Sequence, residues 1–407
     1  MKILQICSQV PYPPVDGGKV GIFNITKYLA KRGHKIAMIA LGDPVDASYA
    51  PLRSYCDLHV VSMSTKNSVI GVALNLFSSL PYNISKYSSN KLQTIIASVL
   101  NKNTFDVVHI DSLHMASYGV WIMREYRLPV ILREHNVEST IMERYLFTAT
   151  NPLLRIYIAM QLRRIKRYEA KMAGEFDSCC PITDVDARRI IQMQPNAKIK
   201  VISGGVEGTL FTEYCDTKER IPNSLVFIGV LNWIPNQDAL EWFIKEVFPR
   251  ILIGAPGTKL FIIGKDAPSK LLQYESEKII FKGFIPDLKK ETLKYEISIA
   301  PFRIGGGLRL KIIECLAMSL PVVATEVGCE GIEVKDGDSI LIGNTAEEFA
   351  EKTLHLLNNP VLRERIARRG YTVSDRLYRW ESVAEKFEEV YRRVISEVGQ
   401  RKTVGIL

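Results

Sequence analysis

Short apolar runs alternate with amphipathic stretches along most of the chain. Residues 1–10 (MKILQICSQV) suit a strand that is covered on both faces, and KIAMIAL at 35–41 suits another. Between them lie a turn and a stretch at 19–33 with the apolar spacing of a helix. The order strand, helix, strand predicts a parallel sheet with right-handed crossovers. We interpret the first run as a buried strand rather than a signal peptide, because turn residues follow it instead of a small-residue cleavage site.

The same pattern recurs in two series, separated by a stretch rich in glycine. The first series predicts further strands at 58–63, 105–110, 129–134, 176–183 and 197–203. The second series predicts strands at 225–230, 259–264, 278–283, 297–302, 321–325 and 339–343. Helical stretches or turns separate the strands, as doubly wound sheets require. The pattern therefore predicts two Rossmann-like α/β domains.

The length of the chain favours the same organisation, because 407 residues exceed what one ordinary core holds. Proline and glycine residues cluster at 195–215, where we place the change of domain. We expect a first domain at 1–200, a second domain at 201–375, and a C-terminal helix at 376–407 that packs back on the first domain.

Composition narrows the class of protein but not its partner. Hydrophobic residues make up 47% and charged residues 24%, which is typical of a folded globular protein. The net charge of +9 suits nucleic acid, an anionic membrane surface or a phosphorylated ligand. Because aromatic motifs are not interleaved with the positive charge, nucleic acid is the least favoured of these partners. No segment reaches the ~20 apolar residues of a membrane span.

The seven cysteines form no CxxC pair and no zinc-like spacing with histidine. We therefore expect reduced thiols of a cytosolic protein, and no metal site.

Two segments could contact something outside the fold. Residues 150–174 predict a long amphipathic helix with a basic face, which either covers the first sheet or rests on anionic lipid. Residues 68–83 are apolar for a connecting stretch. They predict either a buried helix or a loop that faces an acceptor or a membrane.

The strongest chemical signal lies at 300–325, where a strand, three glycines and a helix follow one another. Gly305, Gly306 and Gly307 let the backbone approach a ligand closely. Free N–H groups at the start of the following helix favour an anion there. Arg303, Arg309 and Lys311 add positive charge at the same place, and Glu314 shares the helix face of Lys311. The segment predicts a diphosphate site with a carboxylate left over for a ribose diol.

Weaker signals follow strands of the first domain. Asp16, Gly17 and Gly18 lie between the first strand and a helix, so they form either a tight turn or a phosphate contact. They are not the GxGxxG fingerprint of a dehydrogenase, which disfavours that class. His135 follows the strand at 129–134, at the edge of the sheet where crevice ligands bind. His109 and Asp111 end the preceding strand, and we expect them to line the acceptor side.

Motifs along nearly the whole chain now suggest a family. The chain resembles GT-B glycosyltransferases of the large retaining family 4, the group 1 transferases. The matching motifs are PPVDGG (13–18), REHN (133–136), GGVEGTLF (204–211), FIGVLNWIPNQDAL (227–240), GFIPDL (283–288) and EGI (330–332). The Trp-x-Pro-Asn sequence at 233–236 is similar to that of bacterial surface-polysaccharide enzymes.

The resemblance implies two Rossmann-like domains that face each other across a cleft and C-terminal helices that return toward the first domain. It also implies that Glu314 holds the ribose of the donor, that His135 contacts the donor sugar and the reacting region, and that backbone near Gly283 contacts the base. We expect Arg303, Lys311 and His135 to be the catalytic residues. The expected donor-binding residues are Gly17, Gly18, Gly283, Phe284, Ile285, Gly306, Gly307, Leu308, Arg309 and Glu314.

Some family positions differ in this chain. Gly306 stands where the first glutamate of the family's Glu-x7-Glu pair is usual. Val230 and Asn236 stand about where an arginine and a lysine often hold the diphosphate. We therefore expect Arg303 and Lys311 to take over the phosphate, with Arg309 as a lesser candidate.

Together the residues and the resemblance predict a metal-independent, retaining glycosyltransferase. It would move a hexose-type sugar from a UDP- or GDP-linked donor to a glycan or lipid-linked acceptor, in bacterial cell-surface polysaccharide synthesis. We expect it in the cytoplasm, with peripheral contact to the inner face of the membrane as a further option. A sugar-nucleotide epimerase or hydrolase, and a non-catalytic nucleotide-sugar binding protein, are the alternatives.

Overall fold

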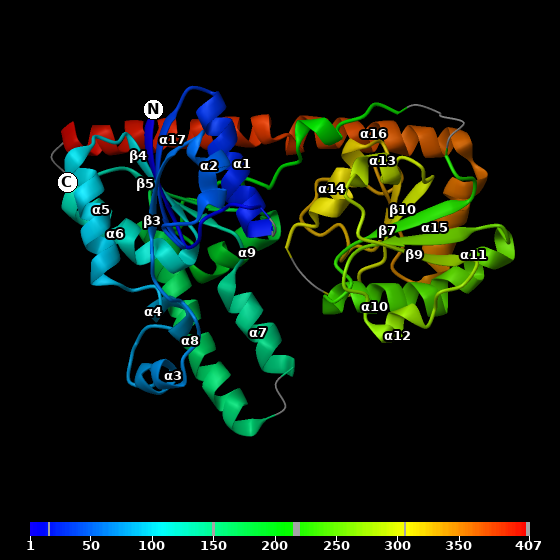
Figure 1. Cartoon of the computed structure of the whole chain (residues 1–407), viewed down its shortest axis with the longest axis horizontal. Coiled ribbons are helices and arrows are strands. Elements are labelled where there is room, and N and C mark those ends of the chain that lie inside the picture. The colour runs from blue at the N-terminus through cyan, green and yellow to red at the C-terminus, as the bar shows by residue number, and fades with distance from the viewer. Residues whose placement is uncertain (15–16, 149–150, 215–219, 305–306, 404–407) are drawn as a thin grey trace. The chain divides into compact units, whose positions relative to one another are not determined.

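The computed structural model describes residues 1–14, 17–148, 151–214, 220–304 and 307–403 (Figure 1). The chain forms two compact units. Unit 1 comprises Met1–Ser203 together with the chain from Val383 onward, and unit 2 comprises Gly204–Ser382.

Unit 1 is built on a parallel sheet of six strands in the order β3-β2-β1-β4-β5-β6. The strands are β1 (Lys2–Cys7), β2 (Lys35–Leu41), β3 (Asp57–Val61), β4 (Val107–Asp111), β5 (Val130–Glu134) and β6 (Ser178–Pro181). Their register places Cys7 beside Asp111, and Asp111 beside Arg133. The strand order reverses direction between β1 and β4, so ligands are expected beyond the carboxyl ends of these two strands.

Helices cover both faces of this sheet. They are α1 (Gly17–Lys31), α2 (Ala50–Arg53), α3 (Val69–Asn75), α4 (Tyr82–Ser85), α5 (Asn90–Lys102), α6 (Ala116–Tyr126), α7 (Glu138–Thr148), α8 (Pro152–Glu175) and α9 (Asp184–Met193). Asn151 caps α8, because its side-chain oxygen accepts hydrogen bonds from the N–H groups of Leu153 and Leu154.

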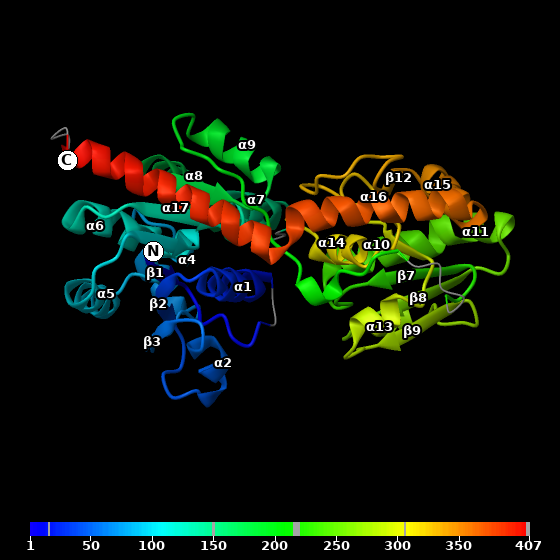
Figure 2. The ribbon, with the colours of Figure 1, turned by 90° about the horizontal axis from the view of Figure 1, so that it is seen from above.

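The last helix, α17 (Trp380–Thr403), belongs to unit 1 from Val383 onward, and Figures 1 and 2 show it running along that unit. Its residues Phe387 and Tyr391 are buried. The Tyr391 hydroxyl lies 2.6 Å from Nδ1 of His109 in β4. Helix α17, almost at the end of the chain, therefore completes the core of unit 1.

Unit 2 repeats the architecture with the strand order β12-β11-β10-β7-β8-β9. Its strands are β7 (Ser224–Ile228), β8 (Lys259–Ile263), β9 (Ile279–Gly283), β10 (Ile297–Ala300), β11 (Val322–Ala324) and β12 (Leu341–Ile342). Its helices are α10 (Ile234–Trp242), α11 (Phe248–Gly254), α12 (Ser269–Leu272), α13 (Leu288–Thr292), α14 (Leu310–Ala317), α15 (Ala346–Asn358) and α16 (Pro360–Tyr378). Both sheets are doubly wound, which confirms the predicted fold class.

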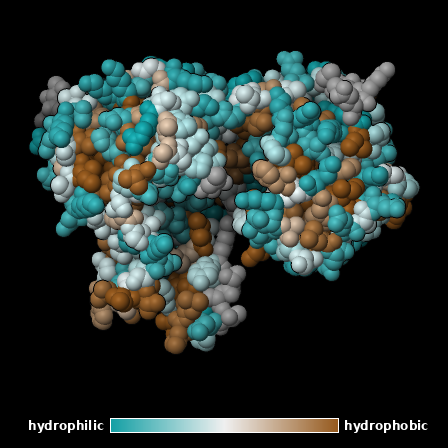
Figure 3. Space-filling view, in the orientation of Figure 1, coloured by the Kyte–Doolittle hydropathy of each residue, from teal (hydrophilic) through white to brown (hydrophobic). Residues whose placement is uncertain are grey.

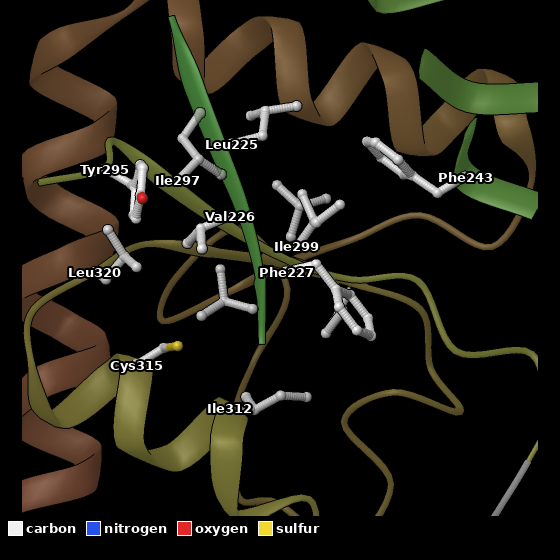
Figure 4. Packing of buried hydrophobic residues seen from close by; sticks show 14 of the residues in the cluster. Leu225, Val226, Phe227, Phe243, Tyr295, Ile297, Ile299, Ile312, Cys315 and Leu320 are labelled. Carbon is white, nitrogen blue, oxygen red and sulfur yellow. The ribbon is translucent and has the colours of Figure 1, made fainter. Parts of the chain in front are cut away.

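The core of unit 2 fixes the helix that the sequence singled out. Figure 4 shows Phe227 of β7 and Ile299 of β10 in one packed cluster with Ile312 and Cys315 of α14. Removing such buried apolar surface from water contributes about 1.5–3 kcal/mol for each large side chain. The amino end of α14 is therefore anchored by the buried face of the helix behind it.

One predicted strand of unit 1 is absent, and a second segment matches neither of its two expected forms in full. Residues 197–203 form no strand, and Ile199 makes only an isolated bridge to Cys179. Residues 68–83 contain a helix, α3, but this helix is not buried, because its apolar side chains are exposed. Residues 198–202 do run along β6, where the N–H of Cys179 donates to the Lys198 carbonyl at 2.8 Å, but the pairing does not become a regular strand. Helix α3 is held on α8 by polar contacts rather than by its apolar side chains. None of the helices in the described ranges is long and apolar enough to cross a bilayer.

Candidate functional site

A cavity of about 950 Å³ opens at the carboxyl ends of the strands of unit 1. The loops that follow β1, β2, β3, β4 and β5 all contribute to its wall. They lie together because the carboxyl ends of parallel strands meet at one edge of a sheet. The lining residues include Ser8, Gln9, Gly42, Asp43, Ser62, Ser64, Thr65, Lys66, Tyr87, Ser112, His114, His135, Asn136 and Glu138. Most of these side chains are polar and can hydrogen-bond to hydroxyl groups, so the cavity suits a sugar-like ligand.

A buried carboxylate, Asp111, lies directly behind this cavity. Its oxygens accept hydrogen bonds from Gln5 Nε2 at 3.1 Å and from a terminal guanidinium nitrogen of Arg133 at 2.9 Å. Burial by itself would raise the pKa of Asp111, but the charge of Arg133 and the contact with His135 hold it well below its usual range. The carboxylate therefore stays ionised at neutral pH.

His135 connects this carboxylate to the cavity. Its Nε2 contacts Asp111 Oδ1, while 18% of its side chain remains exposed at the cavity wall. The same Nε2 lies 2.7 Å from a terminal guanidinium nitrogen of Arg133, so Asp111 and Arg133 together fix the orientation of the imidazole. The structure thus gives the predicted His135 an orienting partner and access to a ligand.

The expectation that His109 and Asp111 line the acceptor side is wrong, because both side chains are completely buried. The two residues are two positions apart in β4 and so share one face of the sheet. Tyr391 of α17 covers His109 there. Burial lowers the pKa of His109 to about 4, so its ring is neutral and acts as a packing and hydrogen-bonding group.

Glu138, which the sequence analysis missed, is another titratable group of the cavity wall. It begins α7, and its backbone N–H donates a hydrogen bond of 2.7 Å to Glu169 Oε1 on α8. Burial and the charge of Glu169 raise the pKa of Glu138 to about 7. A carboxyl group with this pKa can donate or accept a hydrogen bond from a ligand hydroxyl near neutral pH. No sequence signal marks it, since its partner lies 31 positions away.

In unit 2, Lys311 and Glu314 lie together on the first turns of α14. Lys311 Nζ donates a hydrogen bond of 2.6 Å to Glu314 Oε2. Lys311 is half-exposed and Glu314 is mostly buried. An ion pair this close to solvent is worth at most about 1 kcal/mol, so an incoming ligand can replace it at little cost. The pair can then present a cation to a phosphate and a carboxylate to a diol.

Arg309 and Arg303 lie in different surroundings. Arg309 is buried at the N-cap position of α14, where its side chain makes no cap hydrogen bond and its guanidinium lies 4.7 Å from the centroid of the Phe302 ring. Arg303 donates two hydrogen bonds to Asp238 of α10, at 2.6 and 3.1 Å. The structure therefore brings Lys311 and Glu314 together, whereas it pairs Arg303 with α10.

A second cavity, of about 450 Å³, lies at the carboxyl ends of β7, β8 and β9. Gly283 and Phe284, two predicted base-contacting residues, are in its wall, and Gly283 has the positive φ of 67° that favours glycine. Ile285 instead packs partly against the core of unit 2. Gly264, also in the wall, lets the segments after β7 and β8 approach closely, because a Cβ there would lie 1.8 Å from the carbonyl oxygen of Gly229.

The remaining predicted positions are less informative. Gly17 and Gly18 open α1, and no atom lies within 4 Å of where a Cβ of Gly17 would be. Gly307 has a positive φ of 80° and Leu308 is partly buried, whereas Gly305, Gly306 and Asp16 lie outside the described residues. Asn236 is buried, and its side-chain amide donates to the carbonyl of Val230 at 2.8 Å. It therefore closes the loop before α10.

Comparison with known families covers both units. Residues 15–208 match the family described as Glycosyltransferase Family 4, and residues 222–359 match the family described as Glycosyl transferases group 1. The two matches together span most of the chain. The chain belongs to the family 4, group 1 glycosyltransferases. Its fold is the GT-B fold, and the enzyme transfers a sugar from a nucleotide sugar.

Individual relatives of this glycosyltransferase have low sequence identity, but the alignments cover most of both proteins. An "uncharacterized 44.6 kDa protein in cps region" of Klebsiella pneumoniae is 24% identical over 374 residues, which cover 88% of this chain and 90% of the relative. The alpha-monoglucosyldiacylglycerol synthase of Acholeplasma laidlawii is 21% identical over 323 residues, covering 73% and 78%. The structure of Anabaena HepE in complex with UDP-glucose superposes with a TM-score of 0.66 at 14% identity, covering 97% and 100%.

Within the ranges that the structure describes, no group of three or more His, Cys, Asp or Glu residues is placed to hold a metal ion.

The pKa of Glu138 predicts a pH-dependent stability. Its folded value of about 7 lies above the ordinary 4.5, so the native protein binds more protons than the unfolded chain between these values. Stability is therefore lost as pH rises through about 7. We expect Glu138→Gln, which removes this titration, to raise the melting temperature relative to the wild type more at about pH 8 than at about pH 5.

Differential scanning calorimetry at both pH values measures this difference. Glu125→Gln, at an exposed position of α6, is the matched control and should behave alike at both. An equal effect of Glu138→Gln at the two pH values would contradict the assignment.

Proposed function

We propose that this glycosyltransferase moves a hexose-type sugar from a UDP- or GDP-linked donor to a glycan or lipid-linked acceptor, with retention of anomeric configuration and without a metal ion. The observation that carries the proposal is the Lys311–Glu314 pair at the amino end of α14. We further propose that the product enters bacterial cell-surface polysaccharide synthesis. The described cysteines are buried and unbridged, which supports a cytoplasmic location.

The donor nucleotide is assigned to unit 2. The positive end of the α14 dipole and the positive charge of Lys311 favour the diphosphate. Glu314 would accept hydrogen bonds from the ribose hydroxyls once Lys311 turns to the phosphate. The cavity beside Gly283 and Phe284 supports a base site next to it. The UDP-glucose bound by HepE is a hexose donor of this class.

The leaving nucleotide diphosphate gains negative charge as the glycosidic bond breaks. Fixed amide dipoles and a lysine stabilise that charge most strongly where it grows, which lowers the barrier. This supports a reaction that needs no metal ion. In the retaining step that we propose, the acceptor oxygen attacks the face from which the phosphate departs. The acceptor proton passes to the departing phosphate oxygen.

The acceptor is assigned to the polar cavity of unit 1. Its hydroxyl-rich wall and Glu138 support an acceptor with several hydroxyl groups. We propose that His135, held by Asp111, donates a hydrogen bond to the donor sugar. The name of the Acholeplasma relative, alpha-monoglucosyldiacylglycerol synthase, supports the lipid-linked alternative for the acceptor.

The proposed function is tested by incubating the purified enzyme with UDP- and GDP-linked hexoses and a panel of glycan and lipid-linked acceptors, with and without EDTA. Proton NMR of the product reports its anomeric configuration. We expect the configuration of the donor and a rate that EDTA does not change. An inverted product, a metal requirement, donor turnover without acceptor, interconversion of two sugar nucleotides, or binding without transfer would each overturn the proposal.

Removing the cation of the donor site should weaken nucleotide binding. A charge-assisted hydrogen bond contributes about 1.5–3 kcal/mol, so we expect Lys311→Ala to lower the affinity for the nucleotide diphosphate about tenfold or more. Glu314→Ala should weaken binding as well, through the lost ribose contact. Isothermal titration calorimetry measures both effects.

Glu364→Ala is the matched control, since it breaks an exposed ion pair with Arg368 on α16 of the same unit. Its nucleotide affinity should equal that of the wild type. Unchanged affinity in both Lys311→Ala and Glu314→Ala would remove α14 from the donor site.

His135 should matter for turnover rather than for nucleotide binding. We expect His135→Ala to lower kcat about a hundredfold or more, because a positioned acid or hydrogen-bond donor contributes that much. The affinity for the nucleotide diphosphate should stay the same. His59→Ala, a partly exposed histidine paired with Asp57 in the same unit, serves as control in steady-state kinetics. A wild-type kcat in His135→Ala would exclude the proposed role.

A further inference from the structure

Helix α3 has its apolar side chains outside and its polar side chain inside. Of its seven residues, Asn75 is the buried one, with 4% of its surface exposed. Val69 is 88% exposed, and Phe77, just after the helix, is 94% exposed. An ordinary surface helix shows the opposite arrangement, with its apolar stripe facing the core. The apolar side chains of α3 therefore do not serve the packing of unit 1.

Polar contacts hold α3 in place instead. Gln161 of α8 donates a hydrogen bond of 2.9 Å to the side-chain oxygen of Asn75. Arg164, one turn further along α8, donates to the backbone carbonyls of Asn75 and Leu76 at 2.8 and 2.9 Å. These bonds satisfy the carboxyl end of α3 and fix the helix on α8. The outward direction of its apolar side chains is thus built into the fold.

The start of α8 continues this apolar surface. Leu153, Leu154 and Ile156 are all exposed there. Figure 3 shows hydrophobic residues gathered at the end of unit 1 where Figure 1 labels α3 and the lower part of α8. We call Val69, Ile70, Leu74, Phe77, Leu153 and Ile156 the apolar tip. Scattered exposed apolar residues are normal, but a group of this kind marks a surface that meets an apolar partner.

Most of the charges around the apolar tip are positive. Residues 58–105 and 144–168, which contain α3 and most of α8, include no aspartate or glutamate. Exposed cations lie along α8, namely Arg155, Arg163 and Arg167, whereas the neighbouring Lys166 is ion-paired with Glu143 of α7. Apolar side chains next to cations suit the boundary between acyl chains and anionic head groups. A second copy of the chain would instead bring like charges together, which disfavours self-association through this surface.

We propose that the apolar tip inserts into the interface of a bilayer that contains anionic lipid, with the cations of α8 at the head groups. The proposal does not depend on the donor, the acceptor or the reaction. It describes a membrane-docking surface on unit 1, formed by α3 and the amino-terminal half of α8. A protein partner or a second copy of the chain is the competing occupant.

Vesicle flotation tests the docking surface. The full-length protein is mixed with vesicles of phosphatidylcholine alone or of phosphatidylcholine with phosphatidylglycerol. We expect binding to the anionic vesicles and an I70S/F77S variant that binds them about tenfold or more weakly, since two apolar side chains no longer leave water. R155Q/R163Q should weaken binding to anionic vesicles while leaving binding to neutral vesicles unchanged.

An I253S/V361S variant is the matched control, because these two apolar side chains in unit 2 are 83% and 80% exposed. It should bind like the wild type. Circular dichroism and melting temperature confirm that I70S/F77S is folded. Failure of the wild type to bind either vesicle, equal binding of I70S/F77S, or an equal loss in the control would overturn the proposal. A concentration-dependent dimer that I70S/F77S abolishes would assign the surface to a second copy instead.

Discussion

The buried carboxylate of Asp111 holds the functional edge of unit 1 together. Removing a carboxylate from water costs several kcal/mol, and only several good partners offset this cost. Here the partners come from β1, β5 and the loop after β5, in the form of Gln5, Arg133 and His135. Gln5 in turn accepts a hydrogen bond of 2.7 Å from Thr26 of α1. One ionised group therefore connects β1, β4, β5 and, through Gln5, α1, and it orients His135.

Unit 2 has the same architecture as unit 1, but the charged pair of its proposed site is partly exposed to solvent. Its proposed donor site needs groups that stay available for a ligand, so its charges lie at the surface and in weak pairs. Lys311 and Glu314 neutralise each other at 2.6 Å on a helix whose other face is fully packed. The anchored helix keeps the position of the two side chains, while the low cost of separating them leaves both open to substrate. The backbone of α14 is thus held rigidly, while the ends of the Lys311 and Glu314 side chains can move.

The sequence predicted most of this architecture because parallel strands buried on both faces leave a strong apolar signature. The strands of both sheets and the position of α14 were visible in it. Contacts between distant segments were not. The pairing of Arg303 with Asp238 joins residues 65 positions apart, and the burial of His109 depends on Tyr391 at the far end of the chain. Glu138 became a candidate only when α8 brought Glu169 against it.

The return of α17 to unit 1 has a consequence for the synthesis of the protein. Unit 1 is discontinuous in sequence, whereas unit 2 is one uninterrupted segment inserted into it. A ribosome therefore releases the whole of unit 2 before it releases Phe387 and Tyr391, which complete the core around His109. Until then, the face of β4 that carries His109 lacks this aromatic cover. The nascent first unit is thus the part of this enzyme most exposed to aggregation and to chaperones.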